Sequence, residues 1–293
     1  MNNLLSYISA HKKLMIIIIL LIVLTGYFIW LIYENTIINV THYDVSSKNI
    51  PKEFNNFKIA QISDFHNTVF GENNETLLLD LELEKPDIIV ITGDYIDCRH
   101  TDLSVAESLT KRLVRIAPVY YCTGNHESRI PDELKKLEKM FEKNKVNVLR
   151  NNKQLIKRGK QSIRICGIDD PDFLGVDMSD EDKEAKMTKR INALKKEDGK
   201  YCILLSHRPE LFDIYCKTGV GLALTGHAHG GQIRLPFIGP VFSPSEGLFP
   251  KYAEGMHTNQ NTTMVVSRGL GQSQFPLRIN NSPELVIVTL HNQ

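Results

Sequence analysis

Residues 57–66 read FKIAQISDFH, a short apolar run followed by an aspartate and a histidine. The run Phe57–Ser63 has the length and the β-rich composition of a buried strand. Asp64 and His66 stand where this strand ends, two positions apart. Because alternate residues of an extended segment face the same side, both side chains can reach one centre. The stretch therefore predicts a strand that delivers a carboxylate and an imidazole to a candidate metal site.

Four later apolar runs follow the same plan, each a predicted strand that ends in polar or metal-binding residue types. They are Ile88–Thr92 before Gly93 and Asp94, Val119–Cys122 before Gly124, Asn125, His126 and Glu127, Ile203–Leu205 before His207, and Leu222–Leu224 before Gly226, His227 and His229. In sheets whose strands alternate with helices, ligands bind beyond the carboxyl ends of the strands. The glycines stand where the chain must turn sharply off a strand. The five strand ends would thus bring two aspartates, an asparagine and several histidines together.

The donor types in this set restrict the chemistry. Carboxylate and amide oxygens combined with imidazoles, without a thiolate, suit Mn²⁺, Fe or Zn²⁺ and suit Ca²⁺ poorly. Asp97, Asp169 and Asp170 also follow strand-like runs, but acidic residues there are commonly helix caps or turn formers, so their role stays open. The sequence contains neither a C-x-x-C pair nor a G-x-x-x-x-G-K-[ST] loop, so zinc ribbons and P-loop NTPases are not indicated.

Helical patterns separate the early strands. In Leu103–Ile116 the apolar residues recur at helical spacing, and Asp102 is the expected N-cap. The early alternation of strand and helix predicts parallel pairing with helices outside, and the later strands add a second sheet. The remaining expected elements are helices near Glu75–Leu83, Asp132–Glu142 and Asp180–Lys196, and strands at Ile163–Cys166, Met264–Ser267 and Leu285–Leu290.

The N-terminal region has the properties of a membrane anchor. Residues 14–33 contain no charged side chain, and twenty helical residues span ~30 Å, the thickness of a bilayer's hydrocarbon core. A cleaved signal peptide would have a shorter apolar region and an A-x-A-like site after it, and none follows here. We therefore expect a cytosolic N-terminus at 1–13, a transmembrane anchor at 14–33, a juxtamembrane linker and edge segment at 34–56, and one domain at 57–293.

Charge placement predicts the orientation and the partners. Lys12 and Lys13 precede the apolar segment, so the positive-inside rule leaves the N-terminus in the cytosol and the body outside. The whole chain has a formal net charge of +1, and since residues 1–33 hold these two lysines and no acid, the remaining 260 residues sum to −1. A body without excess positive charge argues against a nucleic-acid partner. We expect a single-pass protein of the cell membrane with an extracytoplasmic body.

A second apolar stretch, residues 235–242, lies just after His229 and reads LPFIGPVF. Pro236, Gly239 and Pro240 make it a poor helix and a poor central strand. One interpretation is a loop folded over the second sheet and buried, as most large apolar side chains are. The other is an exposed lip beside the metal site that enters the bilayer or grips acyl chains.

Taken together, the motifs resemble those of the calcineurin-like metallophosphoesterase family. The resemblance rests on D-x-H at 64–66, G-D at 93–94, G-N-H-E at 124–127, the lone His207 and G-H-x-H at 226–229, and it covers about residues 57–291. G-H-A-H-G-G-Q at 226–232 and S-R-G-L-G at 267–271, behind an anchor, are similar to a bacterial branch of membrane-associated phosphoesterases. The resemblance implies an α/β fold, a four-layer α/β/β/α sandwich of two mixed sheets, preceded by one transmembrane helix.

The resemblance also implies a role for each site residue. The cofactors would be two divalent metal ions, with manganese preferred over iron or zinc. One metal would be bound by Asp64, His66 and His229, the other by Asn125, His207 and His227, with Asp94 bridging both. His126 would face the substrate without binding metal and would protonate the leaving oxygen, oriented by Glu127 or another carboxylate.

The expected activity is hydrolysis of a phosphoester, phosphodiester or pyrophosphate bond by in-line attack of a hydroxide shared by two metals. The partners would be the lipid bilayer, through residues 14–33, and a phosphorylated small molecule or lipid, such as a UDP-diacylglucosamine type precursor. Two alternatives are a non-catalytic scaffold on the same fold, which would be expected to lose ligands, and a nuclease, which would show a basic groove. Nucleotide-linked lipid precursors are expected in the cytosol, which conflicts with the orientation predicted above.

Overall fold

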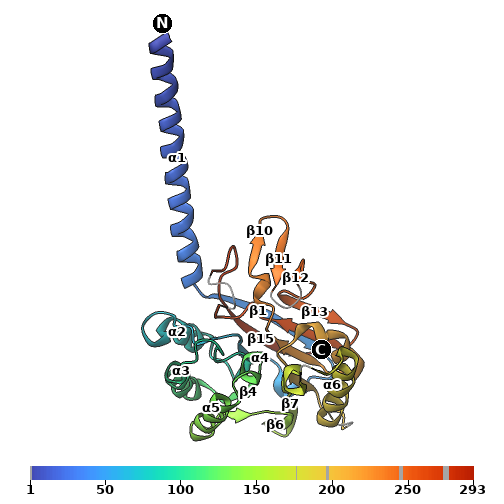
Figure 1. The fold of residues 1–293 in the computed structure, drawn as a ribbon. Helices are drawn as coiled ribbons and strands as arrows, with labels where there is room; N and C mark the ends of the chain where they lie inside the picture. The colour runs from blue at the N-terminus through green and yellow to red at the C-terminus, as the bar shows by residue number, and fades with distance from the viewer. Residues whose placement is uncertain (1, 176, 196–197, 244–246, 273–276) are drawn as a thin grey trace.

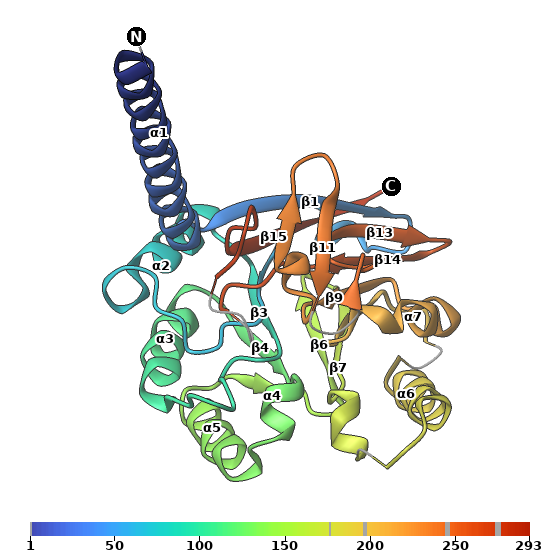
Figure 2. The same cartoon turned by 45° about the horizontal axis from the view of Figure 1, so that its top comes forward.

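The computed structural model describes residues 2–175, 177–195, 198–243, 247–272 and 277–293, with side chains from residue 11 onward. Two six-stranded sheets pack face to face, and helices cover the outer face of each (Figures 1 and 2). The apolar side chains form three buried clusters, one between the sheets and one beneath each helical layer. The chain is thus a four-layer α/β/β/α sandwich of two mixed sheets, as the sequence predicted.

The first sheet contains the strands from the N-terminal half and the last strand of the chain. Its central strands β2, β3 and β4 are parallel, in register at Ile59 with Ile88 and at Val90 with Tyr120. Strand β15 runs antiparallel to β2, and β1 pairs with β15 in parallel. In spatial order the strands are β1 (Asn39–Ser47), β15 (Glu284–Asn292), β2 (Phe57–Ile62), β3 (Ile88–Thr92), β4 (Val119–Cys122) and β5 (Asn147–Val148).

The second sheet contains the strands from the C-terminal half. Its four inner strands are parallel, and the two edge strands pair with them antiparallel. In spatial order they are β13 (Gly255–Asn259), β14 (Thr262–Val266), β9 (Leu222–Thr225), β8 (Cys202–Leu205), β7 (Gln161–Gly167) and β6 (Asn152–Arg158). The predicted strands at 163–166, 203–205, 222–224 and 264–267 all fall in this sheet.

The four helices predicted beyond the N-terminal segment all form. In α3 (Leu103–Ile116) the Asp102 carboxylate accepts hydrogen bonds from the backbone N–H groups of Ser104 and Val105, as expected of an N-cap. The first sheet is covered by α2 (Glu75–Glu84), α3 and α5 (Pro131–Lys143), and the second by α6 (Asp180–Lys195) and α7 (Phe212–Thr218) (Figure 2). Lys196, the expected last residue of α6, lies outside the described residues. A single-turn helix, α4 (Asn125–Ser128), follows β4. The predicted helices are α2, α3, α5 and α6, whereas α4 and α7 were not predicted.

Helix α1 (Asn2–Thr36) projects from the body (Figure 1). Among the described residues it is the one helix long and apolar enough to span a membrane, with a mean hydropathy of 2.9 over an 18-residue window within His11–Thr36 and little of that window buried. The helix continues past the predicted end at residue 33 because its last turn is held by the body. The Asn35 side chain donates to the Arg278 carbonyl oxygen at 2.8 Å and accepts the Arg278 N–H at 2.9 Å, a pair of bonds called here the Asn35 clamp.

The segment after α1 belongs to the first sheet. Strand β1 pairs with β15 over its full length, from Asn39 beside Glu284 to Ser47 beside Asn292. The sequence predicted a linker and edge segment at 34–56 and a domain that starts at residue 57, and the structure places strand β1 of this segment in the folded body. The reason is that β15, at the other end of the chain, supplies the pairing partner.

A small three-stranded sheet rises from the body beside α1 (Figure 1). It consists of β10 (Ile233–Leu235), β11 (Gly239–Ser243) and β12 (Gly247–Leu248). Phe237 at its tip is fully exposed, with a relative accessibility of 109%, and Ile238 and Phe242 are exposed too. The interpretation of residues 235–242 as a loop buried over the second sheet is therefore wrong.

Candidate metal centre

The site lies where the carboxyl ends of five strands meet between the two sheets. The ends of β2, β3 and β4 from the first sheet face those of β8 and β9 from the second. All eight residues that the sequence singled out come together there: Asp64, His66, Asp94, Asn125, His126, His207, His227 and His229. His227 is half-buried and the other seven are buried.

One group of donor atoms gathers around His229. Its Nε2 atom lies 3.4 Å from Asp64 Oδ1 and 3.4 Å from His66 Nε2. His66 Nε2 in turn lies 3.6 Å from Asp94 Oδ2. Three elements distant in sequence thus supply one cluster of carboxylate and imidazole donors that can hold a metal ion.

A second group gathers around His207. Its Nε2 atom lies 3.1 Å from Asn125 Oδ1, 3.2 Å from His227 Nδ1 and 3.3 Å from Asp94 Oδ2. Asp94 Oδ2 therefore borders both groups. The two donor clusters share a single carboxylate oxygen.

The spacing within each group fits divalent cations. Bonds of about 2.0–2.2 Å from a metal to nitrogen or oxygen place neighbouring donors about 3.0–3.5 Å apart. The distances around His207 and His229, from 3.1 to 3.4 Å, match this spacing. The donor types match as well, because imidazole, carboxylate and amide oxygen together suit borderline divalent metals. The fold and these clusters support divalent metal ions without determining which metal.

The backbone holds these donors in a costly conformation. Asp64, His66, Asp94, His227 and His229 all have positive φ angles, between 48° and 67°. Non-glycine residues rarely adopt this region, and such strain persists at functional sites where the surroundings enforce it. Here the Asp64 N–H donates to the Gly93 carbonyl oxygen at 3.1 Å, and the His66 N–H donates to that of Asp94 at 3.0 Å.

Two of the glycines are required by close approach. A Cβ atom on Gly226 would lie 1.9 Å from Ser63 Oγ and 2.2 Å from Asp64 Oδ2. A Cβ atom on Gly124 would lie 2.2 Å from Asp94 Oδ1. These glycines leave the space that the two metal-binding carboxylates occupy.

Charges in the site reinforce one another. Burial raises the pKa of Asp94, but the neighbouring His207, His66 and His126 outweigh it and hold that pKa well below its usual value. Burial lowers the pKa of His207, but the carboxylates of Asp94 and Asp64 raise it to about 10. The Asp94 carboxylate and the His207 imidazole therefore stabilise each other's charged forms.

His126 lies beside the donor groups with one nitrogen already engaged. Its Nδ1 accepts the Cys98 N–H at 3.1 Å, and its Nε2 lies 3.9 Å from Asp94 Oδ2. Burial lowers the pKa of His126 to about 4, so the imidazole is neutral at pH 7. Because Nδ1 accepts a hydrogen bond, the ring hydrogen resides on Nε2, the atom that faces the site. The nearby carboxylate is Asp97, with Oδ2 at 3.5 Å from His126 Nδ1.

Glu127 does not orient His126, as the sequence had suggested it might do, but holds the turn that carries Asp94. Its Oε2 accepts the N–H groups of Asp94 and Gly124 at 3.0 and 2.7 Å. Its Oε1 accepts those of Tyr95 and Ile96 at 2.7 and 3.2 Å. One buried carboxylate thus satisfies four backbone donors, which joins the loop after β3 to the loop after β4.

Replacing Glu127 with alanine should destabilise the protein by ~2–4 kcal/mol, because four buried N–H groups lose their acceptor. Thermal unfolding of the full chain in detergent checks this, and metal content should fall with the melting temperature. Glu142→Ala, on the exposed face of α5, is the matched control and should unfold like the parent. An unchanged melting temperature for Glu127→Ala would contradict the assigned role.

Two arginines near the site were not predicted from the sequence. Arg208 donates through Nη1 to His227 Nε2 at 3.0 Å and binds the Asp170 carboxylate through Nε and Nη2. This contact turns His227 so that Nδ1 faces His207. The buried Arg278 donates to the Gly271 and Arg268 carbonyl oxygens, and its Nη2 lies 3.3 Å from His229 Nδ1.

The ambiguous aspartates bind protein partners in the structure. Asp170 pairs with Arg208, and its side chain also caps the turn at Asp172. Asp169 pairs with Arg150 at 2.8 Å and accepts from Thr123. Arg208 follows His207 directly in the sequence. A basic residue next to a histidine at a strand end is therefore the pattern from which the role of Arg208 could have been predicted.

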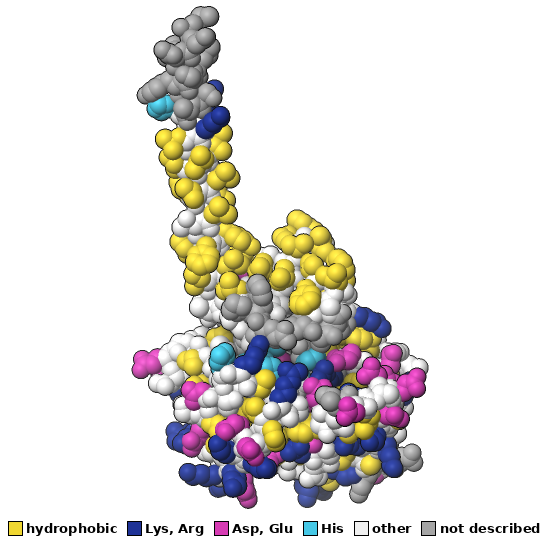
Figure 3. Space-filling view, viewed as in Figure 1, with side chains coloured by type: hydrophobic (Ala, Val, Ile, Leu, Met, Phe, Trp, Pro, Cys, Tyr) yellow, Lys and Arg dark blue, Asp and Glu magenta, His cyan; other side chains and the backbone are white. Residues whose placement is uncertain are grey.

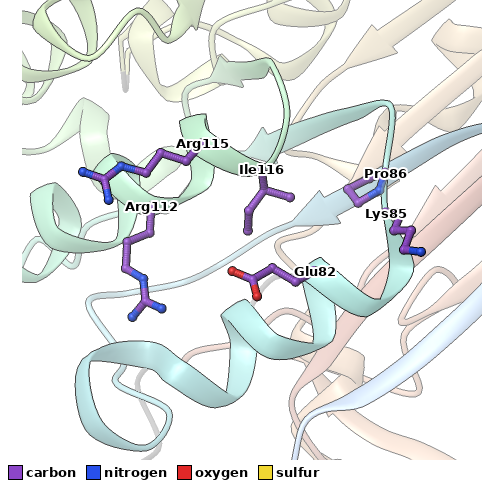
Figure 4. A pocket seen from close by; sticks show the side chains of 6 residues that line it. All are labelled: Glu82, Lys85, Pro86, Arg112, Arg115 and Ile116. Carbon is purple, nitrogen blue, oxygen red and sulfur yellow. The ribbon is translucent and has the colours of Figure 1, made fainter.

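A separate surface cavity of about 470 Å³ lies at the opposite edge of the first sheet (Figure 4). Its lining comes from α2, α3 and the turn that precedes β3: Glu82, Lys85, Pro86, Arg112, Arg115 and Ile116. Since this turn leads into the amino end of β3, the cavity is not part of the metal centre.

Two buried donor groups that share a carboxylate, at the strand ends of an α/β/β/α sandwich, define a metal-dependent phosphoesterase of the hydrolase class. The comparison with known families agrees. Residues 57–231 match the family model described as calcineurin-like phosphoesterase. The chain belongs to this family.

Relatives also match along most of the chain. An uncharacterized metallophosphoesterase, YkuE of Bacillus subtilis (strain 168), is 32% identical over 262 residues, which is 88% of this chain and 87% of the relative. Phosphodiesterase YaeI of Escherichia coli (strain K12) is 26% identical, over 80% of this chain and 82% of its own. The crystal structure of TT1561 of Thermus thermophilus shares the fold, with a TM-score of 0.50 and 12% identity over 73% of this chain and 89% of that chain.

Proposed function

We propose that this protein is a membrane-anchored phosphoesterase that works with two divalent cations, manganese in the first instance. The observation that supports this most directly is Asp94 Oδ2, which lies 3.3 Å from His207 Nε2 and 3.6 Å from His66 Nε2. One carboxylate oxygen therefore borders both donor groups. One cation would be held by Asp64, His66 and His229, the other by Asn125, His207 and His227, with Asp94 shared.

Bound cations would stabilise charge on the phosphoryl oxygens and lower the pKa of a water molecule for in-line attack. The protein supplies the rest. The Nε2–H of His126 is positioned to donate to the substrate, and in the reaction to the leaving oxygen. The Cys98 N–H fixes the imidazole in this tautomer. Glu127 keeps the two loops that carry Asp94 and His126 in place.

The substrate that we propose is a phosphodiester or pyrophosphate attached to a lipid, of the kind found in UDP-diacylglucosamine type precursors. Helix α1 supports this choice, because it has the length and hydropathy of a membrane span and its last turn is clamped to the body near the site. The donor groups alone serve monoesters, diesters and pyrophosphates equally.

We propose further that the body lies outside the cytosol, because Lys12 and Lys13 precede the apolar part of α1. A nucleotide-linked precursor is expected on the other side, so orientation decides which lipid is accessible. A reporter enzyme fused after Gln293, active only when exported, should be active in intact cells. An inactive reporter would place the C-terminus in the cytosol, which would contradict the proposed orientation and favour the nucleotide-linked lipid.

The activity test uses the full chain in lipid nanodiscs, stripped of metal and refilled with Mn²⁺. A water-soluble aryl phosphodiester should be hydrolysed, and a chelator should abolish the reaction. With UDP-diacylglucosamine and other phosphorylated lipids in the disc, kcat/KM should exceed that for head groups lacking acyl chains. Equal rates with and without acyl chains would contradict the lipid substrate, and no hydrolysis of any substrate would contradict the enzyme.

A further inference from the structure

The small sheet beside α1 exposes large apolar side chains that have no covering element in the described structure. We call this set the apolar lip: Leu235, Phe237, Ile238, Phe242, Leu248 and Phe249. Relative accessibility ranges from 42% at Phe242 to 109% at Phe237. Single exposed apolar residues are common on proteins, but a contiguous group of this kind marks an interaction surface.

The apolar lip lies on the same side of the body as α1. Figure 3 shows its hydrophobic side chains rising next to the apolar stretch of the helix, with the charged side chains gathered on the body below. The two apolar surfaces thus project in one direction. A membrane that contains α1 would therefore lie close to the lip.

Asn280 ties the lip to α1. Its side-chain Nδ2 donates to the Arg234 carbonyl oxygen in β10 at 2.9 Å. Its backbone N–H donates to Glu34 Oε2, in the last turns of α1, at 3.1 Å. The Arg234 N–H also donates to the Ile279 carbonyl oxygen at 3.0 Å. One short segment therefore holds the helix and the lip in a fixed relation.

The described residues of the small sheet offer no unpaired charge to a polar partner. Within its described parts, residues 233–243 and 247–249, the one charged side chain is Arg234. Arg234 pairs with Glu254 and donates to the Gly230 carbonyl oxygen at 3.0 Å. Binding through this surface would depend on burial of apolar area and hardly on salt.

The lip is also continuous with the metal centre. His229 and Gly231 form the turn that leads directly into β10, and Gln232 pairs with Phe242 in β11. A Cβ atom on Gly231 would lie 2.4 Å from Pro240 Cβ, so the base of the lip is packed against the site. A surface that the lip enters is therefore separated from the donor groups only by the length of β10.

We propose that the apolar lip inserts into the lipid bilayer as a second membrane contact, and that the lip and α1 together hold the metal centre against the lipid head groups. The inference rests on the proposed membrane span of α1 and adds the surface from which the substrate is taken. Its occupant is the apolar edge of the bilayer, with no requirement for anionic lipid.

A single-tryptophan experiment on the full chain tests the proposal. Trp30 is the only tryptophan, so Trp30→Phe provides a silent background. Phe237→Trp then places a probe at the tip of the lip. Leu155→Trp is the matched control, since Leu155 is also an exposed apolar residue, at 46%, but lies in β6 on the side of the body away from α1 (Figure 1). Both proteins are reconstituted in phosphatidylcholine vesicles, with and without brominated acyl chains.

The Phe237→Trp emission should shift to the blue and lose most of its intensity in brominated vesicles, at low and at high salt alike. The Leu155→Trp emission should remain water-like and unquenched. Equal melting temperatures for the two variants establish that both are folded. The measurement needs neither metal nor turnover, so its outcome is independent of whether the protein hydrolyses the proposed substrates.

Two results would overturn the proposal. Emission from Phe237→Trp that matches the Leu155→Trp control would leave the lip in water. A blue shift without quenching by brominated lipid, which grows with the number of chains per vesicle, would make the occupant a second copy of the protein.

Discussion

Asp94→Ala should abolish hydrolysis and empty both cation sites. Asp94 Oδ2 lies 3.3 Å from His207 Nε2 and 3.6 Å from His66 Nε2, so its loss disturbs both donor groups. Removing both cations costs about 5 kcal/mol or more of transition-state stabilisation, which corresponds to a fall of at least ~10⁴-fold in kcat/KM. The measurement is hydrolysis of an aryl phosphodiester by the full chain in nanodiscs, with metal content determined on the same sample.

The control is Asp213→Ala, which removes an exposed aspartate from α7 and should keep both metal and activity. Adding a chelator to the parent protein should reproduce the loss seen in Asp94→Ala. Parental activity in an Asp94→Ala sample that contains no metal would show that the chemistry occurs elsewhere.

His126→Ala should lower kcat by roughly 10²–10⁴-fold, the range for loss of a general acid, while the metal content stays at its parental value. The Nδ1 atom of His126 accepts the Cys98 N–H, which leaves its Nε2–H to face the substrate. The drop should appear in kcat more than in KM, because proton donation acts in the transition state.

The leaving group supplies the internal control for His126. A substrate that releases an acidic phenol needs no proton, so the loss in His126→Ala should shrink as the leaving group becomes more acidic. His126 also lies within reach of His66 and Asp94, in an arrangement that can itself hold a metal. If His126→Ala emptied a metal site, the residue would be a ligand and the general-acid assignment would be wrong.

The strands and the donor residues could be predicted because their signals are local. Phe57–Ser63 and Ile88–Thr92 are apolar runs of strand length, and the glycines and ligands follow at fixed short offsets. The rule that strand ends converge then placed Asp64 and His229 in one site although 165 residues separate them. Their contact at 3.4 Å matches that expectation.

The features that escaped prediction depend on partners far away in the sequence. An edge segment was predicted within residues 34–56, but its pairing with β15 was not, because nothing in residues 39–47 identifies that partner. Glu127 was expected as a candidate to orient His126, because its four backbone contacts exist only once β3 and β4 lie side by side. The apolar lip had two interpretations for the same reason, since only tertiary packing decides whether such a segment is covered.

The Asn35 clamp has a consequence for how far the active site can reach. Asn35 binds both the N–H and the carbonyl oxygen of Arg278, whose guanidinium lies against His229, so the body cannot swing on the end of α1 as it would on a flexible tether. With α1 in a bilayer, the tilt of the helix sets the height of the cations above the acyl chains. A lipid-linked substrate would then be selected by the height of its phosphorus atom above the acyl chains, and the protein would reach it by diffusing in two dimensions within the membrane.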